Sequence, residues 1–192
     1  MSLDLHFPTI ILHEHINDHE SINDDIKSKI GEIKKTVDSG GDGWIGRPYN
    51  TCGTWDISKD KNFETITNII TDYANNYCSQ LGVDTGVHPV KCEEGWLNIY
   101  NENDFQEYHN HAGFKLSAVY YVDVSEEGRI YFESPFIDNN PLKIRLLGPI
   151  TDTRADYNVS TGDVIVFRGY LRHCVPPVTK GSTRITLAYN FN

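Results

Sequence analysis

Two histidines one residue apart, His109 and His111, stand directly before a strongly β-forming run at 116–122. Residues two apart in a strand point to the same face, so both imidazole rings can be aimed at one point. A third histidine, His173, lies far downstream, after a turn and another β-forming run. Imidazoles that converge in this way suit iron, zinc, copper or nickel rather than magnesium or calcium. These three histidines are therefore the candidate metal ligands.

An arginine, Arg184, opens the last β-forming run a short distance after His173. An arginine side chain directed into a barrel is costly unless it meets an anion, and its planar fork suits a carboxylate. Thr186 lies on the same strand face as Arg184. The two residues are therefore candidates for binding the far end of a dicarboxylate.

The helices and strands that must position these residues are expected in two parts of the chain, one before and one after Gly82. The first part is expected to hold one strand at 5–13 and two amphipathic helices. One helix begins near Asp18 or Ser21 and ends before Gly40, and the other covers 60–81. A loop or a short edge hairpin is expected to connect them.

After Gly82 the sequence consists of short runs that alternate apolar and polar residues between turns, which is typical of a β-sandwich or barrel. The predicted strands are 94–100, 108–111, 116–124, 129–133, 142–147, 151–158, 163–167, 172–175 and 184–190. We expect a single domain over 1–192, mainly β with flanking helices. Its jelly-roll body covers 83–192, and 1–82 supplies a strand and two bracing helices.

The net charge of −10 is concentrated in residues 1–105, which carry eight Lys and Arg against eighteen Asp and Glu. An acidic protein with no basic run does not favour nucleic acid as a partner. The four cysteines form no CxxC pair, which is typical of free thiols in a reducing compartment. There is no signal-peptide pattern, and no apolar run approaches the about 20 residues of a membrane span. We expect a cytoplasmic protein without a membrane partner.

A second pair with the same spacing, His13 and His15, competes with the first as a metal motif. It lies on the approach to a helix, and no strong strand follows it. Short histidine-rich tracts are only compositional signals. We therefore expect His13, His15 and the nearby His19 to be surface residues.

Several stretches spread in order along the chain together resemble the 2-oxoglutarate/Fe(II)-dependent oxygenases. In particular they resemble a small branch common in phage and marine bacterial sequences. The stretches are 5–10, 96–100, 109–113, 116–122, 128–135, 162–167, 171–177 and 184–187. The resemblance implies a double-stranded β-helix fold, a jelly roll or cupin-like barrel.

The resemblance also implies a site and an activity. Fe(II) would be held by His109 and His173, and 2-oxoglutarate would chelate the iron and pair with Arg184. The candidate helpers for this co-substrate are Asn98, Tyr121 and Thr186. The implied reaction is hydroxylation with release of succinate and CO2, in the cytoplasm of the host cell if the protein is phage-encoded. The substrate, whether a small molecule or a protein or peptide, is not specified by the sequence, and a homodimer stays open.

The third metal ligand is an open choice. The wider superfamily carries HxD or HxE, so His111 stands where a carboxylate is expected, although the small branch has HxH here too. Strand geometry favours His111 as a ligand, which would leave the iron with its full +2 charge. The alternatives are a carboxylate from Glu107 or Asp123, or a His111 that lies behind the ligands without touching the metal.

Two other classes of protein fit part of the pattern. A cupin-type enzyme would need a glutamate where Lys115 stands, and a three-histidine zinc enzyme gives Arg184 no role. A non-enzymatic β-sandwich binding module would leave the three histidines far apart.

Overall fold

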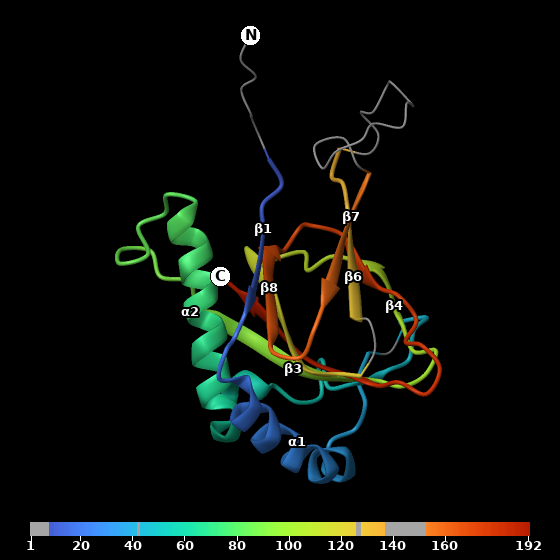
Figure 1. Cartoon of the computed structure of the whole chain (residues 1–192). Coiled ribbons are helices and arrows are strands. Elements are labelled where there is room, and N and C mark those ends of the chain that lie inside the picture. Colours follow the sequence, from blue (N-terminus) through green and yellow to red (C-terminus); the bar gives the residue numbers. More distant parts are fainter. Residues whose placement is uncertain (1–7, 42, 126–127, 137–152) are drawn as a thin grey trace.

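Two antiparallel β-sheets pack face to face, and two helices cover the outer face of the larger sheet (Figure 1). The structure is a computed structural model, and it describes residues 8–41, 43–125, 128–136 and 153–192. The helices are α1 (His19–Thr36) and α2 (Glu64–Gln80). The strands are β1 (Ile11–His15), β2 (Tyr49–Asn50), β3 (Cys92–Tyr100), β4 (Gln106–His109), β5 (Leu116–Val124), β6 (Gly128–Glu133), β7 (Arg154–Val159), β8 (Asp163–Arg168), β9 (His173–Val175) and β10 (Arg184–Phe191).

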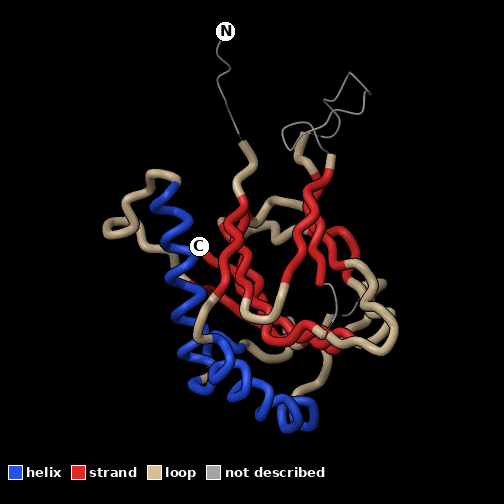
Figure 2. The backbone as a smooth tube through the Cα atoms, viewed as in Figure 1, coloured by secondary structure: helices blue, strands red, loops and turns tan. Residues whose placement is uncertain are grey.

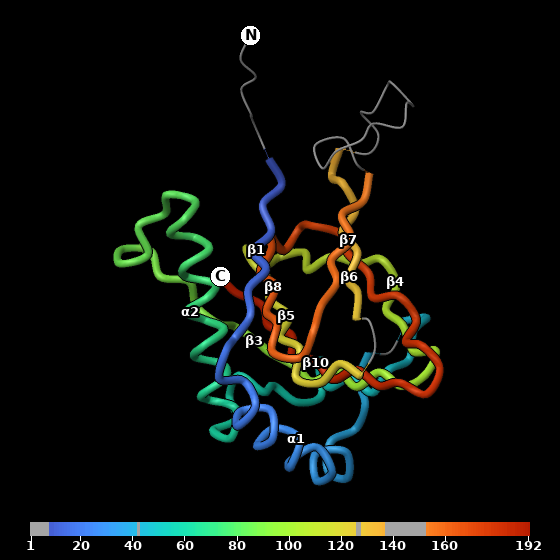
Figure 3. Tube along the Cα trace, in the orientation of Figure 1, coloured from blue at the N-terminus to red at the C-terminus, as the bar shows by residue number. Residues whose placement is uncertain are grey.

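The larger sheet has six strands in the order β1-β8-β5-β10-β3-β2, and the smaller sheet has four in the order β4-β9-β6-β7. Strands β5 and β10 pair at the centre of the larger sheet although they are distant in the sequence (Figure 3). Side chains of β3, β5 and β10 meet those of β4, β6 and β9 in one interior cavity. The expectation of a mainly β fold with flanking helices is confirmed.

The two faces of the larger sheet have different partners because successive strand residues point to opposite sides. Along β5, Ala118 and Tyr120 are buried against the helices, whereas Tyr121 points toward the smaller sheet. The helices contribute Ile26, Ile33, Ile66, Ile70, Ala74 and Tyr77 to this outer core, and Figure 2 shows them gathered on one side of the strands. Burial of a large apolar side chain contributes about 1.5–3 kcal/mol, so the helices hold the sheet from outside. The inner face is left for a functional site.

The second helix is shorter than the sequence pattern predicts. It begins at Glu64 rather than at Asp60, because Ile57–Lys59 and Lys61–Phe63 form 3₁₀ turns. The carboxylates of Asp56 and Asp60 cap these turns, each accepting a hydrogen bond from the backbone N–H two residues further on. Short polar side chains favour such local turns over the helix interior.

The first strand begins at Ile11 rather than at residue 5, and residues 1–7 lie outside the described part of the chain. The predicted strand 142–147 lies outside it as well. Between the helices the chain forms a long connection whose only strand in the described residues is β2, which pairs with β3 at the sheet edge. Both β1 and β2 therefore extend the larger sheet.

Candidate metal centre

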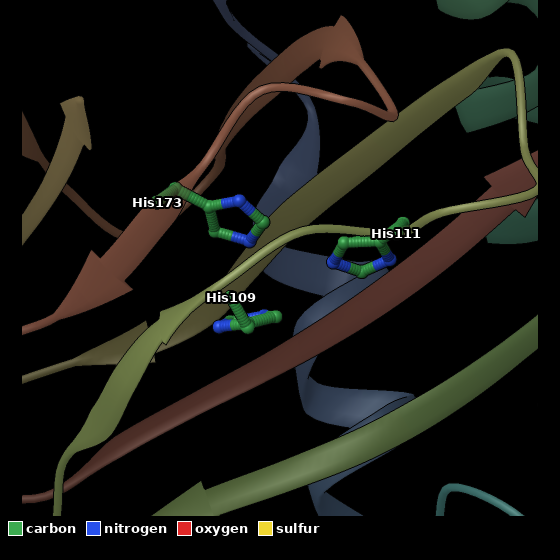
Figure 4. Close-up of side chains that lie close together, drawn as sticks. All are labelled: His109, His111 and His173. Carbon is green, nitrogen blue, oxygen red and sulfur yellow. The ribbon is translucent and has the colours of Figure 1, made fainter. Parts of the chain in front are cut away.

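Three imidazole rings converge in the interior between the two sheets (Figure 4). His109 ends β4 and lies directly opposite His173, the first residue of β9, in the antiparallel pair. The ring centroids of these two residues are 4.2 Å apart, and those of His111 lie 5.3 Å from His109 and 5.1 Å from His173. One ligand nitrogen of each ring lies within 4.8 Å of the other two. A binding module without a metal site gives no reason for this convergence.

His111 reaches this cluster from a turn and not from a strand. The sequence predicted a strand through residue 111, but β4 ends at His109, so strand alternation is the wrong reason for its position. Its backbone N–H donates to the carbonyl of Gly169 at 2.8 Å, which ties the turn to the end of β8. The ring is stacked on Trp96 of β3, with centroids 5.5 Å apart. Contacts with residues distant in the sequence, and not the alternation of a strand, therefore place the His111 ring in the cluster.

Each of the three rings uses its Nδ1 atom in a hydrogen bond within the protein. His109 Nδ1 lies 2.8 Å from the backbone carbonyl of Glu107, and His173 Nδ1 lies 3.0 Å from that of Leu171. A carbonyl only accepts, so Nδ1 carries the proton and Nε2 keeps its lone pair.

The Nδ1 atom of His111 lies 2.6 Å from the side-chain oxygen of Asn190. Its Nε2 atom is buried and has no hydrogen-bond partner among the described residues. A buried polar atom without a partner is costly, and a metal ion would satisfy it. The orphaned Nε2 faces the cluster that the other two rings form.

The same environment keeps the three rings in their neutral, metal-binding form. Burial lowers the pKa of His109, although its hydrogen bond to the Glu107 carbonyl opposes this. Burial, with a smaller effect of His109, lowers the pKa of His111 to about 4. Burial and the two neighbouring histidines lower the pKa of His173 well below its usual value. Since a metal competes with protons for these nitrogens, the site is prepared for metal at neutral pH.

Neither of the two carboxylates considered as alternative ligands belongs to the cluster. Glu107 accepts hydrogen bonds from the backbone N–H groups of Ile45 at 2.6 Å and Gly46 at 3.1 Å. These bonds outweigh burial and lower the pKa of Glu107, so this carboxylate anchors a loop. Asp123 lies opposite Ile185 in the β5–β10 pair and does not line the cavity. Among the described residues, only the three histidines form a group of at least three potential ligands.

A cavity of about 330 Å³ extends from the histidines along the inner face of the larger sheet. Its floor consists of cross-strand neighbours on β5, β10 and β3, because alternate residues of β10 all face inward. The successive rows are Asn190–Glu94, Val119–Ala188–Trp96, Tyr121–Thr186–Asn98 and finally Arg184–Tyr100. The histidines and Arg184 therefore share one cavity.

The Arg184 end of the cavity is closed and polar. Arg184 is only 1% exposed, and its Nη1 donates to the carbonyl of Arg129 at 3.2 Å. The phenols of Tyr100 and Tyr121 are buried beside it; burial raises the pKa of both, and the charge of Arg184 opposes this. Both phenols therefore stay protonated and can donate hydrogen bonds.

Two further candidates for co-substrate binding, Asn98 and Thr186, lie in the next row. Asn98 Nδ2 donates to Thr186 Oγ1 at 3.2 Å, and Asn98 Oδ1 accepts from Asn50 Nδ2 at 2.8 Å. Since Thr186 accepts here, its own hydroxyl hydrogen is left to donate toward a ligand. All four residues predicted to bind the co-substrate thus line the cavity with the three histidines.

Some residues of the site were not found from the sequence. Trp44 packs edge-on against His109 with centroids 5.0 Å apart, and Asn190 and Glu94 stand behind His111. Asn190 carried a usable signal, because it lies on the same face of the last strand as Arg184 and Thr186. Trp44 carried none, since it comes from the long connection between the helices.

The other histidine pair is separate from the cluster. His13 and His15 are exposed, as expected, and both contact the carboxylate of Asp163 at 3.1 and 2.8 Å. His19 is half-buried and bonds to the carbonyl of Ile16. His13 and His15 therefore fasten β1 to the beginning of β8.

Comparison with known protein families decides between the enzyme classes. A family model described as "Putative 2OG-Fe(II) oxygenase" matches residues 94–190, half of the chain. The match includes the three histidines and Arg184. The chain belongs to the 2OG-Fe(II) oxygenase family. A search of curated protein sequences finds no match.

Solved oxygenase structures share the fold of this family member over nearly its whole length. The carbocyclase SnoK from nogalamycin biosynthesis, described as non-heme and alpha-ketoglutarate-dependent, is 12% identical with a TM-score of 0.66, over 95% of this chain and 79% of SnoK. A Pseudomonas putida prolyl-4-hydroxylase is 12% identical with a TM-score of 0.61, over 96% and 92% of the two chains. AviO1 from Streptomyces viridochromogenes Tue57 is 13% identical with a TM-score of 0.64, over 95% and 89%. The two facing sheets are thus the expected double-stranded β-helix. No described helix of the oxygenase is long and apolar enough to cross a membrane.

Proposed function

We propose that this oxygenase binds Fe(II) through His109, His111 and His173 and binds 2-oxoglutarate through Arg184, and that it hydroxylates an organic substrate. The observation that carries the proposal is the set of three neutral imidazoles. Each has its Nδ1 proton donated to a protein oxygen, so three lone pairs are left for one ion.

The donor set fits iron. Imidazole nitrogen is a ligand that suits Fe(II) and does not suit magnesium or calcium. Two nitrogens bound to one ion by bonds of about 2.1 Å are at most about 4.2 Å apart. Three nitrogens at right angles around one ion are about 3.0 Å apart, so from the present limit of 4.8 Å the rings must close by no more than roughly 1.8 Å. When bound, the iron supplies the chemistry that couples oxidative decarboxylation of 2-oxoglutarate to substrate oxidation.

The protein itself supplies binding, orientation and exclusion of water. The guanidinium of Arg184 pairs with the far carboxylate of 2-oxoglutarate, and Tyr121 and Thr186 donate further hydrogen bonds to it. Three neutral ligands leave the full charge of the metal to be balanced by this dianion. The apolar walls formed by Val119 and Ile130 keep water from the buried end.

The substrate enters from the opposite end of the cavity. Asn110 and Ala112 are exposed and also line the cavity, so it opens to solvent beside His111. Trp44 stands at this end against His109 and supplies an apolar surface for the substrate. Arg184, by contrast, is buried at the closed end of the cavity. The co-substrate and the substrate therefore bind at opposite ends of the same cavity.

An anaerobic titration tests the proposal. Purified protein is mixed with Fe(II) and then with 2-oxoglutarate, followed by air, and the visible spectrum and succinate are measured. We expect a weak charge-transfer band that needs both components, succinate formation in air, and loss of both signals in His173→Ala. A protein that binds zinc but gives neither band nor succinate with iron would contradict the proposal.

A further inference from the structure

The side chain of Asn190 connects the metal cluster to two neighbouring strands. Its Oδ1 lies 2.6 Å from His111 Nδ1 and accepts from Ser117 Oγ at 2.7 Å, and its Nδ2 donates to Glu94 Oε1 at 2.8 Å. Asn190 is only 3% exposed. The register explains the contacts, because Asn190 of β10 is the direct cross-strand neighbour of Glu94 on β3 and Ser117 on β5.

These contacts allow only one orientation of the Asn190 amide. The hydrogen bond to Glu94 Oε1 is donated by the NH2 group of Asn190, which cannot accept one. The amide oxygen then faces His111, and this oxygen can only accept. The proton of the His111 ring is consequently held on Nδ1, and the lone pair on Nε2 points into the cluster.

His111 differs in this respect from the other two histidines. His109 and His173 are oriented by backbone carbonyls of residues two positions earlier in the chain, which no substitution removes. His111 is oriented by a side chain 79 residues away in the sequence. Without that side chain a neutral imidazole exchanges between two tautomers, and the tautomer with hydrogen on Nε2 cannot bind a metal through that atom.

We propose that Asn190 is a positioning residue that makes His111 a metal ligand, and that Glu94 keeps the Asn190 amide in the orientation this requires. The inference rests on the proposed function, since it concerns how the third ligand is made competent. It also gives a reason why a histidine can stand where the wider superfamily has a carboxylate: the site stabilises one tautomer in place of a fixed charge. Outer partners of metal ligands typically change metal affinity by about 10- to 100-fold.

Cobalt(II) is the probe, since it binds at histidine sites and shifts the NMR signals of protons on the ligand rings. We expect the wild-type protein to show three shifted, exchangeable ring N–H signals, one from each Nδ1. Asn190→Leu should weaken Co(II) binding by about 10- to 100-fold and remove or broaden one of the three signals. Glu94→Leu should weaken binding less, and Glu94→Gln should change it little, because the glutamine oxygen can still accept from Asn190.

Two matched variants separate positioning from a merely structural role. Ser117→Ala removes the other hydrogen bond to the same oxygen and should leave all three N–H signals. Thr67→Val perturbs the opposite face of β10, where Thr67 contacts the Tyr189 hydroxyl at 3.4 Å, and should leave Co(II) affinity unchanged. If Thr67→Val weakens Co(II) binding as much as Asn190→Leu, the positioning role is wrong.

A second set of variants, in which the carboxylate and the amide of Glu94 and Asn190 are exchanged, tests the same role if Asn190→Leu does not fold. Asn190→Asp alone brings two carboxylates together and should weaken Co(II) binding. Asn190→Asp combined with Glu94→Gln restores a donor beside the new carboxylate, and the coupling between the two changes should recover much of the affinity.

The outcomes distinguish this inference from the proposed function. A wild-type protein that does not bind Co(II) would overturn the proposed metal site itself. A wild-type protein with three N–H signals, together with an Asn190→Leu variant that keeps full affinity and all three signals, would overturn the positioning role alone. Equal losses in Glu94→Gln and Glu94→Leu would overturn the role given to Glu94.

Discussion

Replacement of Arg184 by alanine should weaken 2-oxoglutarate binding far more than metal binding. Arg184 lies at the closed end of the cavity, and the metal cluster lies toward the open end. One of its N–H groups donates to the Arg129 carbonyl, and the planar fork can give two more to a carboxylate. Each hydrogen bond to a charged group is worth about 1.5–3 kcal/mol, so the loss of two costs about 3–6 kcal/mol. Since about 1.4 kcal/mol is a factor of ten, the Kd should rise by at least about 100-fold.

The assay is an anaerobic titration of the Fe(II)-loaded protein with 2-oxoglutarate, alongside a separate titration of the metal alone. Arg184→Lys keeps the charge but loses the fork, and should lie between wild type and Arg184→Ala. Arg154→Ala is the control for loss of an arginine, since Arg154 is exposed and stacks on Tyr131 on the smaller sheet. Equal weakening of metal and 2-oxoglutarate binding in Arg184→Ala would refute the role given to this residue.

Three further predictions follow from the same geometry. The free energy of unfolding of the metal-free protein should fall as pH drops from 6.5 toward 4, because the unfolded state binds protons that buried His111 (pKa about 4) does not. This residue alone contributes up to about 3 kcal/mol, and denaturant titrations should show a shallower pH dependence in His111→Gln. Gly169→Ala should weaken Co(II) binding, because a Cβ there would clash with the Phe114 carbonyl and push the turn that carries His111; unchanged affinity would contradict this. Ile70→Ala should cost about 2–5 kcal/mol of stability but leave Co(II) affinity intact, and a parallel loss of affinity would mean that α2 does more than brace the sheet.

Much of the larger sheet was predictable from the sequence. The strands β3, β5, β8 and β10 lie within two residues of their predicted bounds, because alternation and β-branched or aromatic residues are strong local signals. The expected sharing of one face by Arg184 and Thr186 also follows from local periodicity. Residues that depend only on strand alternation were therefore correctly oriented.

The position of His111 could not be predicted from local sequence patterns. His111 was assigned to a strand, yet it reaches the cluster through a turn held by Gly169 and a ring stacked on Trp96. The alternative ligand Glu107 does not line the cavity, and β4 is irregular between Gln106 and His109. The carboxylate of Glu107 instead accepts hydrogen bonds from a loop some sixty residues earlier. Contacts of this length depend on how the sheets pack, and a single sequence carries no local signal for them.

The start of α2 was missed for a more local reason. The apolar periodicity continues through Phe63, so the pattern gives no sign of a boundary before Glu64. Asp56 and Asp60 divert the chain into two 3₁₀ turns by accepting backbone hydrogen bonds. The hydrogen bonds of these two capping carboxylates therefore set the start of α2, which apolar periodicity alone placed too early.

An anaerobic crystal structure with Fe(II) and 2-oxoglutarate, with diffraction recorded on both sides of the iron absorption edge, is the most direct test of the central claim. We predict one anomalous peak bound by the Nε2 atoms of His109, His111 and His173, with the far carboxylate of 2-oxoglutarate on Arg184. An iron bound by only two of these histidines, or by a protein carboxylate such as that of Glu94, would contradict the three-histidine site.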